Sequence, residues 1–356
     1  MAHTLELAEA LAGCGQHVTV WAPAPRGVTG FHRTVDNGVG VRVVPVPVGS
    51  RDTRSAQVVA CLQGLAEAFE PAYYDIVHAQ GWVSAGAVGP CLHTVHRVER
   101  FGPGDLAQHH RRGLTISTAH VCTSRAVAAE LRAGWGISAA VIPEGVDAVR
   151  FARAAAPGPA AVAARDGWRR RLGRYVLTVG DAVPAQTAEQ VMSALARARA
   201  GGLGLVIVDP PRVAPGRPRH TAWLRASAAS GVPFARPAVG GDVAALIAGA
   251  SAFVLPSGTE WPHPAALQAL AADVPLLTFG TDPCPTVLDA VAAHAADVQE
   301  LAAALDEAIQ APDGQRLQAG RALAAERSWV ASASEHLDLY RATMKASTGN
   351  RTRPAT

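Results

Sequence analysis

The chain has 356 residues, of which 49% are hydrophobic and 17% are charged, and its formal net charge is +3. It is too long for one ordinary domain and too apolar for a disordered protein, so we expect two globular domains. Of its 32 lysine and arginine residues only Lys345 is a lysine. This disfavours Schiff-base enzymes and nucleotide triphosphatases that use a P-loop lysine.

Helices and short apolar strands alternate through the first half of the chain. The first helix ends at Gly13, and Ser124 is expected to cap the fifth. Strands are predicted at 17–21, 39–48, 74–78, 92–95, 120–123 and 141–142, and helices at 4–11, 57–69, from 83, near 106–113 and at 124–133.

The same alternation resumes after residue 173. Strands are predicted at 175–179, 203–208, 232–235, 252–255 and 274–278, and helices at 188–200, 220–230, 242–248, 264–271 and from 285, 298 and 315. Strands that are almost wholly apolar are typical of parallel sheets covered by helices on both faces. The sequence therefore predicts two doubly wound α/β domains that face a cleft at their strand carboxyl ends.

The domain boundary is expected where the alternation stops. Residues 1–150 form the predicted first domain, and 151–173, which contain Pro157-Gly158-Pro159, form a linker. Residues 174–330 form the second domain, and 331–356 form a terminal helix and tail that pack back on the first.

Charge and cysteine usage limit the partners and the compartment. No long block of like charge occurs, so nucleic acid is not an expected partner. The five cysteines are scattered, which is typical of reduced thiols in a cytoplasmic protein. There is no apolar run long enough to span a membrane and no secretory signal.

Polar residues beyond the predicted strands are the candidates for ligand binding, because doubly wound folds bind ligands there. They are His78, Gln80, His93, His96, Ser124, Asp181, Asp209 and Glu260. The imidazole of His96 can donate to a sugar or phosphate oxygen or act in proton transfer, but a hydrogen-bonded loop histidine is the alternative. No carboxylate pattern accompanies His93, His96, His109 and His110, so no metal site is expected.

One segment carries a more specific pattern. Residues 253–278 read as a strand, a loop with Glu260, a helix from Pro264 and a second strand. Pro256-Ser257, Glu260, Leu267, Ala269-Leu270-Ala271 and Val274-Pro275 match, in register, the pattern P-S-x-x-E-G-F-G-L-x-x-L-E-A-L-A-x-G-V-P of the retaining family 4 glycosyltransferases. The segments 3–11, 17–20, 74–80, 94–96, 142–147, 176–180 and 328–340 also resemble that family, in order.

The resemblance implies a GT-B fold of two Rossmann-like domains that transfers a hexose from a nucleotide sugar to a hydroxyl acceptor with retention of configuration. No cofactor or metal is implied, and the acceptor is a small molecule, a lipid or a glycan. The implied site comprises the catalytic residues His96 and Glu260, the donor-side residues Ser124, Gly180, Trp261, His263 and Gln268, and the acceptor-side residues His3, His78 and Gln80.

The chain departs from the family pattern on the donor side. Ala185 and Gln186 stand where an arginine and a lysine hold the diphosphate, and Gln268 replaces the glutamate that holds the ribose. Trp261-Pro-His263 replaces G-F-G, and Glu144 replaces an asparagine. Family members also begin with a strand and a glycine-rich loop, so the first domain is expected to lack its first strand, through truncation or through the choice of start codon.

Three functions stay open at this stage. The first is an active hexosyltransferase. The second is a catalytically inactive GT-B protein that binds a ligand or a partner, because losing two cations weakens transition-state stabilisation. The third is a nucleotide-sugar epimerase of the same fold. Peripheral contact with a membrane is also left open.

Overall fold

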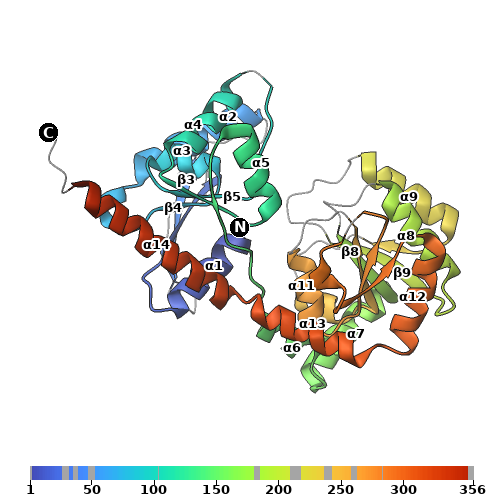
Figure 1. The fold of residues 1–356 in the computed structure, drawn as a ribbon. Helices are drawn as coiled ribbons and strands as arrows, with labels where there is room; N and C mark the ends of the chain where they lie inside the picture. The colour runs from blue at the N-terminus through green and yellow to red at the C-terminus, as the bar shows by residue number, and fades with distance from the viewer. Residues whose placement is uncertain are drawn as a thin grey trace. The chain divides into compact units, whose positions relative to one another are not determined.

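In the computed structural model the chain forms two compact units (Figure 1). Unit 1 contains residues 1–145 and 329–356, and unit 2 contains residues 146–328. The structure describes residues 2–25, 32–34, 39–46, 53–102, 104–179, 185–208, 218–235, 243–257, 263–282 and 284–351.

Residues 151–173, predicted to be a linker, lie inside unit 2 and are helical. They belong to α6 (Ala148–Ala155) and α7 (Pro159–Leu172). The Asp147 carboxylate accepts a hydrogen bond from the backbone N–H of Arg150 and so caps α6. Phe151 and Trp168 are the buried residues of these helices. The segment is therefore part of a domain core.

The strands of unit 1 form two sheets. Four parallel strands follow the order β4 (His78–Ala79), β5 (Leu92–Val95), β6 (Ala119–Cys122), β7 (Ala140–Val141). In the second sheet β3 (Gly40–Val46) lies between β1 (Thr19–Pro25) and β2 (His32–Thr34). Among the described strands, β1 pairs only with β3 and β4 only with β5, so the single sheet expected for this half is divided.

Helices pack around these sheets. They are α1 (Ala2–Gly13), α2 (Arg54–Ala68), α3 (Trp82–Val88), α4 (Asp105–Ile116), α5 (Arg125–Trp135) and α14 (Trp329–Arg351), with a 3-10 turn η1 (Pro71–Tyr73). As predicted, Ser124 caps α5, because its hydroxyl accepts from Val127 N–H. Helix α14 packs against α1, and Trp329 and Tyr340 share a core cluster with Leu7 and Leu92. The last helix is thus part of the first unit.

Helices α3 and α4 approach each other closely at Gly113. A Cβ atom at Gly113 would lie 2.3 Å from the carbonyl oxygen of Trp82. Gly113→Ala should therefore force the helices apart and lower the free energy of unfolding by about 1–3 kcal/mol. Gly134→Ala in α5, with nothing within 4 Å of its Cβ, is the matched control and should stabilise by about 0.4–1 kcal/mol. Urea unfolding of both variants measures this difference, and equal effects would contradict it.

Unit 2 contains one parallel sheet. Its strand order is β10 (Phe234–Ala235), β9 (Leu203–Val208), β8 (Arg174–Val179), β11 (Ala252–Pro256), β12 (Leu276–Phe279), β13 (Ala292–Ala295). Its further helices are α8 (Ala185–Arg197), α9 (Pro218–Ser230), α10 (Val243–Ala248), α11 (Pro264–Ala271), α12 (Val298–Gln310) and α13 (Gly314–Glu326), with a 3-10 turn η2 (Thr286–Leu288). Helix α8 packs against α9 and α12, whereas α11 packs against α6, α10 and α13.

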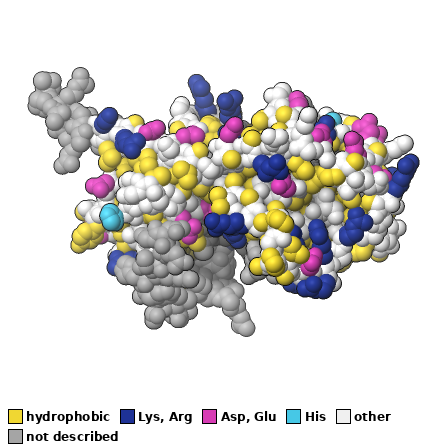
Figure 2. Space-filling view, turned by 90° about the horizontal axis from the view of Figure 1, so that it is seen from below, with side chains coloured by type: hydrophobic (Ala, Val, Ile, Leu, Met, Phe, Trp, Pro, Cys, Tyr) yellow, Lys and Arg dark blue, Asp and Glu magenta, His cyan; other side chains and the backbone are white. Residues whose placement is uncertain are grey.

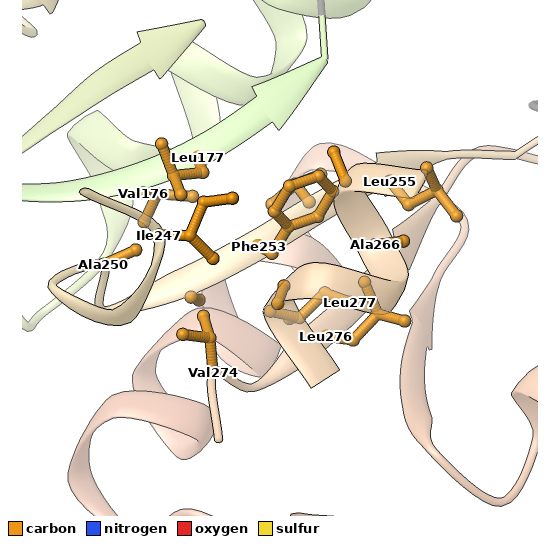
Figure 3. Close-up of a cluster of buried hydrophobic side chains, with 14 of the residues drawn as sticks. Val176, Leu177, Ile247, Ala250, Phe253, Leu255, Ala266, Val274, Leu276 and Leu277 are labelled. Atoms are coloured by element: carbon orange, nitrogen blue, oxygen red, sulfur yellow. The ribbon is translucent and has the colours of Figure 1, made fainter. Parts of the chain in front are cut away.

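Apolar side chains from neighbouring strands and helices form the core of unit 2. Figure 3 shows Leu177 of β8, Phe253 of β11 and Leu277 of β12 beside Ile247 of α10 and Ala266 of α11. All five are fully buried. Strands that are apolar on both faces need helices on both faces, as the sequence pattern indicated.

Basic and acidic side chains are both scattered over the surface that Figure 2 draws. None of the five cysteines forms a disulfide bond. In the part of the chain that the structure describes, no helix combines the length and the apolar character needed to cross a membrane.

Candidate functional site

The polar candidates of unit 1 lie where its parallel strands end. Gln80 follows β4, His96 follows β5, Ser124 follows β6 and Glu144 follows β7. Because these strands run in parallel, their carboxyl ends lie at one edge of the sheet, where α/β folds bind ligands.

Three of these side chains form a cluster, which we call the His3–His96–Glu144 cluster. Nδ1 of His3 lies 3.2 Å from Oε1 of Glu144, and Nδ1 of His96 lies 3.7 Å from the same oxygen. The two imidazole rings meet edge to face with their centroids 4.6 Å apart. Trp329 also packs against His3 edge to face, with ring centroids 5.1 Å apart.

Burial and charge set the protonation of this cluster. Burial alone would raise the pKa of the Glu144 carboxyl, but its contacts with His3 and His96 outweigh burial and hold the pKa below its usual range. Burial lowers the pKa of His3 by more than Glu144 raises it. At neutral pH the cluster therefore contains an ionised carboxylate and a neutral His3 ring.

His3 has an unusual hydrogen-bonding state. Its Nδ1 is close to Glu144, but the approach is not aligned as a hydrogen bond, and neither ring nitrogen of this buried side chain has a hydrogen-bond partner. We therefore treat the 3.2 Å approach as an electrostatic contact. Leaving a buried polar atom unsatisfied costs about 1–3 kcal/mol, so such an atom in a native structure calls for an explanation.

His78 on β4 and Gln80 directly after it lie at the strand next to β5 and are bonded differently from the cluster. Both ring nitrogens of His78 are engaged, Nδ1 with the hydroxyl of Tyr340 at 2.7 Å and Nε2 with the hydroxyl of Thr94 at 2.7 Å. Burial lowers the pKa of His78 well below its usual value. The Gln80 Nε2 lies 3.4 Å from His78 Nε2, while the Gln80 Oε1 is buried without a partner. Gln80 therefore retains an acceptor atom without a partner. His78 links β4 to Thr94 of β5 and to Tyr340 of α14.

Two further buried histidines, His93 on β5 and His336 on α14, carry no charge at neutral pH. Burial lowers the pKa of His93 to about 3 and that of His336 to about 4. Nδ1 of His336 lies 2.8 Å from the backbone carbonyl oxygen of Ser332, and the ring packs beside His78. These histidines belong to the core of unit 1.

Ser124, predicted to lie on the donor side, is 95% buried in unit 1, where it caps α5. The resemblance places the donor mainly in the second domain, whereas the structure places Ser124 in the first. Its structural role therefore accounts for a serine at this position without a ligand.

In unit 2, two helices are the next described elements after two neighbouring parallel strands. Helix α8 follows β8 and begins at Ala185, and α11 follows β11 and begins at Pro264. The first turn of a helix presents free backbone N–H groups and a partial positive charge, which favour anionic groups. This edge of the sheet is therefore suited to a phosphate-bearing ligand.

His263 and Gln268 lie at this edge. His263 occupies the N-cap position of α11, and its side chain does not cap the first turn. Gln268 is partly exposed, whereas its helix neighbours Leu267 and Ala269 are buried. Its amide therefore points away from the core. The other predicted residues of this site, Gly180, Glu260 and Trp261, lie outside the described residues.

At the same edge of the sheet, the backbone of Gly280 lies in close contact with Ser257. Gly280 has φ +127°, and a Cβ atom there would lie 2.2 Å from the Ser257 hydroxyl oxygen. That hydroxyl accepts a hydrogen bond from Asp282 N–H at 3.3 Å. Ser257 therefore packs tightly against the chain that follows β12, and this close contact explains a small polar residue at position 257.

A separate hollow of about 400 Å³ lies at the opposite edge of the unit 2 sheet. Arg174 at the start of β8, Ser251 before β11 and Pro275 before β12 are among the residues that line it. It opens at the amino ends of the strands, away from the first turns of α8 and α11. We therefore do not assign the donor site to this hollow.

Sequence reasoning treated Glu144 only as a departure from a pattern and did not name Tyr340 or His336 as part of the site. Glu144 lies three residues beyond the last residue of β7, and a polar residue just after a parallel strand is a sequence signal for a ligand-binding position. No sequence signal indicated that α14 would bring Tyr340 to within 2.7 Å of His78.

The family model described as Glycosyltransferase Family 4 matches residues 2–150. No curated protein sequence matches the chain significantly.

Several solved structures have the same fold over nearly the whole chain. Sucrose-phosphate synthase from Thermosynechococcus elongatus is 20% identical with a TM-score of 0.70, covering 97% of this chain and 93% of that one. Anabaena HepE in complex with UDP and glucose is 15% identical with a TM-score of 0.68, covering 96% of each chain. WaaG, a glycosyltransferase involved in lipopolysaccharide biosynthesis, is 17% identical with a TM-score of 0.62, covering 95% of each chain.

These neighbours are GT-B glycosyltransferases built from two Rossmann-like domains, which agrees with the fold expected from the sequence. Residues 2–150 of this chain match the Glycosyltransferase Family 4 model, and the chain as a whole has the GT-B fold.

Proposed function

We propose that this protein transfers a hexose from a nucleotide sugar to a hydroxyl group of an acceptor, with retention of the anomeric configuration. The observation that carries the proposal is the pair of helix N-termini, those of α8 and α11, at the carboxyl edge of the unit 2 sheet. Their backbone N–H groups suit a diphosphate. A solved structure of the same fold, that of HepE, contains UDP and glucose.

Unit 2 holds the donor in this proposal. Gln268 extends from α11 and accepts from the ribose hydroxyls through its amide oxygen, and His263 stands before the same helix. Glu260, together with Gly180 and Trp261, contributes the remaining donor contacts proposed from the resemblance.

Unit 1 holds the acceptor. His96 is one-third exposed and contacts the reacting sugar, while His3 and the free Oε1 of Gln80 line the acceptor side. His78 acts through its hydrogen bonds to Thr94 and Tyr340. The acceptor is a small molecule, a lipid or a glycan, and the protein acts in the cytoplasm or at a membrane surface.

A catalytically inactive GT-B protein is the second candidate, and one observation favours it. Helix α8 opens with Ala185 and Gln186, which carry no charge to offset the leaving diphosphate. Removing a single stabilising donor in such a site costs about 2.7–4 kcal/mol of transition-state stabilisation. We therefore expect nucleotide-sugar binding together with slow transfer.

Replacement of His96 tests the proposal. His96→Ala should lower kcat by about 100-fold or more if the imidazole contacts the reacting sugar or its proton. The affinity for UDP-glucose, measured by isothermal titration calorimetry, should change far less, because the nucleotide binds unit 2. The exposed His17 supplies the control variant His17→Ala, which should leave both unchanged.

Two results would contradict the assignment. If UDP- and GDP-sugars show no binding to the wild type at about millimolar concentration, the chain does not use these donors. If His96→Ala retains full kcat, the acceptor-side site lies elsewhere.

A further inference from the structure

Three potential metal ligands from distant parts of the chain meet in unit 1. His3 comes from the first turn of α1, His96 from the end of β5, and Glu144 from the segment after β7. One nitrogen of each histidine and one oxygen of the carboxylate all lie within 4.8 Å of one another. The two nitrogens closest to Glu144 approach the same oxygen, at 3.2 and 3.7 Å.

This cluster is shielded but not sealed. The side chains of His3, Glu144 and His96 are 11%, 22% and 34% exposed, respectively. Trp329 packs against His3 and covers it on one side. The cluster is therefore most accessible to solvent at His96, the side from which a water molecule can reach it.

The charges and hydrogen bonds of the cluster are incomplete. Within the described residues, the only ion-pair partners of the Glu144 carboxylate are the two histidines. Both nitrogens of His3 are buried and lack a hydrogen-bond partner. A cation placed between the three side chains would pair with the carboxylate and accept a lone pair from each ring.

We propose that His3, His96 and Glu144 bind a divalent transition-metal ion, with Zn²⁺ the best match, and that water completes its coordination beside His96. Two imidazole nitrogens and one carboxylate oxygen suit Zn²⁺ and its neighbours, whereas Mg²⁺ and Ca²⁺ prefer oxygen ligands. Three protein ligands with one open position are a common arrangement for zinc.

The ligand spacing is compatible with this ion after small side-chain rotations. Zn–N and Zn–O bonds of about 2.0–2.2 Å place tetrahedral ligands about 3.3–3.5 Å apart. The contact of His3 with Glu144 is already at that spacing. His96, the most exposed member, follows the end of its strand and has the most freedom to close the remaining gap.

The other buried histidines of unit 1 do not offer a comparable set. Both nitrogens of His78 already have hydroxyl partners, and His336 Nδ1 is engaged by a backbone carbonyl. No carboxylate faces His93, His120 or His110 within an ion-pair distance among the described residues. The Glu144 carboxylate therefore distinguishes this cluster from the other buried histidines of unit 1. It stands where an asparagine is usual in the family that the sequence resembles.

The metal would also affect transfer. An ion bound to His96 withdraws that imidazole from the reacting sugar, so Zn²⁺ should inhibit the transferase. This consequence rests on the proposed function, whereas metal binding itself does not. Binding is therefore the primary measurement.

The test uses the full-length untagged protein, freed of metal with EDTA and titrated with Zn²⁺ by isothermal titration calorimetry. We expect one equivalent to bind to the wild type. Glu144→Gln and His96→Gln should each weaken binding by at least about 100-fold, because each removes a ligand. The matched controls Glu67→Gln and His17→Gln, at exposed positions of the same unit, should bind as the wild type does.

Cobalt gives a second readout. Co²⁺ bound to nitrogen and oxygen ligands absorbs visible light, most strongly when it is four-coordinate, and this absorption should be lost in Glu144→Gln. Glu144→Asp, which keeps the carboxylate, should retain part of it. Circular dichroism verifies that each variant is folded. If Glu144→Gln does not fold, His96→Gln, at the most exposed ligand, replaces it as the test variant.

The proposal is overturned if the wild type binds no Zn²⁺ at about 100 μM metal, or if the ligand variants bind it as tightly as the controls. Either result leaves the proposed transferase function intact. Conversely, a protein that binds Zn²⁺ through these residues but transfers no sugar would retain the metal site and lose the proposed function.

Discussion

Ala185→Arg combined with Gln186→Lys is expected to raise the rate of sugar transfer by about 100-fold or more. Both positions lie in the first turn of α8, the next described element after β8. The leaving diphosphate gains negative charge in the transition state, and one preorganised donor in such a site accounts for about 10²–10³ in kcat. Two cations at the first turn should therefore act mainly on kcat.

The substitutions also have a cost. Positive charges near a helix N-terminus oppose the helix dipole by about 0.3–1 kcal/mol each. We thus expect a slightly lower free energy of unfolding together with faster transfer. Steady-state kinetics with UDP-glucose and GDP-mannose, with the acceptor varied, measures the rate, and urea unfolding measures the stability.

Gln190→Lys supplies the matched control, because it adds a positive charge one turn further along the same helix. It should leave kcat unchanged. If the double variant binds the nucleotide sugar but transfers no faster than this control, the first turn of α8 does not contact the diphosphate. Activity that appears only in the double variant would identify the natural protein as the inactive alternative.

Acid is expected to destabilise unit 1 by about 2 kcal/mol for each of His93 and His336 between pH 7.5 and pH 5. Burial lowers the pKa of these rings to about 3 and about 4, from an ordinary value of 6.5. Between the folded and the unfolded values, the unfolded chain binds more protons than the folded one. Their contribution to stability is therefore complete above pH 6.5 and is lost as the pH falls toward the folded values.

Urea unfolding in EDTA, followed by amide hydrogen exchange in β5 and β6, measures the stability of unit 1. His93→Gln and His336→Gln should each flatten its dependence on pH, whatever they do to the stability at pH 7.5. The exposed His17→Gln should not. An unchanged pH dependence in both buried variants would show that these rings are not held neutral by the fold.

The local pattern of the sequence predicts many elements well. The strand at residues 92–95, the strand at 203–208 and the helix at 264–271 agree with the structure at both ends. The Ser124 cap is also confirmed. These segments have strong local signals, because buried parallel strands are continuously apolar and because a helix start needs an N-cap or a proline.

Alanine-rich segments were predicted less well. The helix expected from Pro285 is only the turn η2, and residues 292–295 form strand β13 instead. Alanine suits both the helical and the strand period, so pairing with β12 decides the outcome. Likewise, the strand expected at 74–78 is reduced to β4. The chain forms the turn η1 first, and its hydrogen bonds to β5 begin only at Val77, whose carbonyl accepts from Leu92 N–H.

By itself the sequence determined the alternation of elements, the GT-B resemblance and the candidates His96 and Gln268, because each depends on residues close together in the chain. Only the tertiary structure decided that His3 and Glu144 join His96, and that Trp329 and Tyr340 are the side chains with which the last helix enters the core of unit 1. The physical reason is that burial, charge pairing and ligand geometry depend on distances between elements, and local periodicity carries no information about those distances.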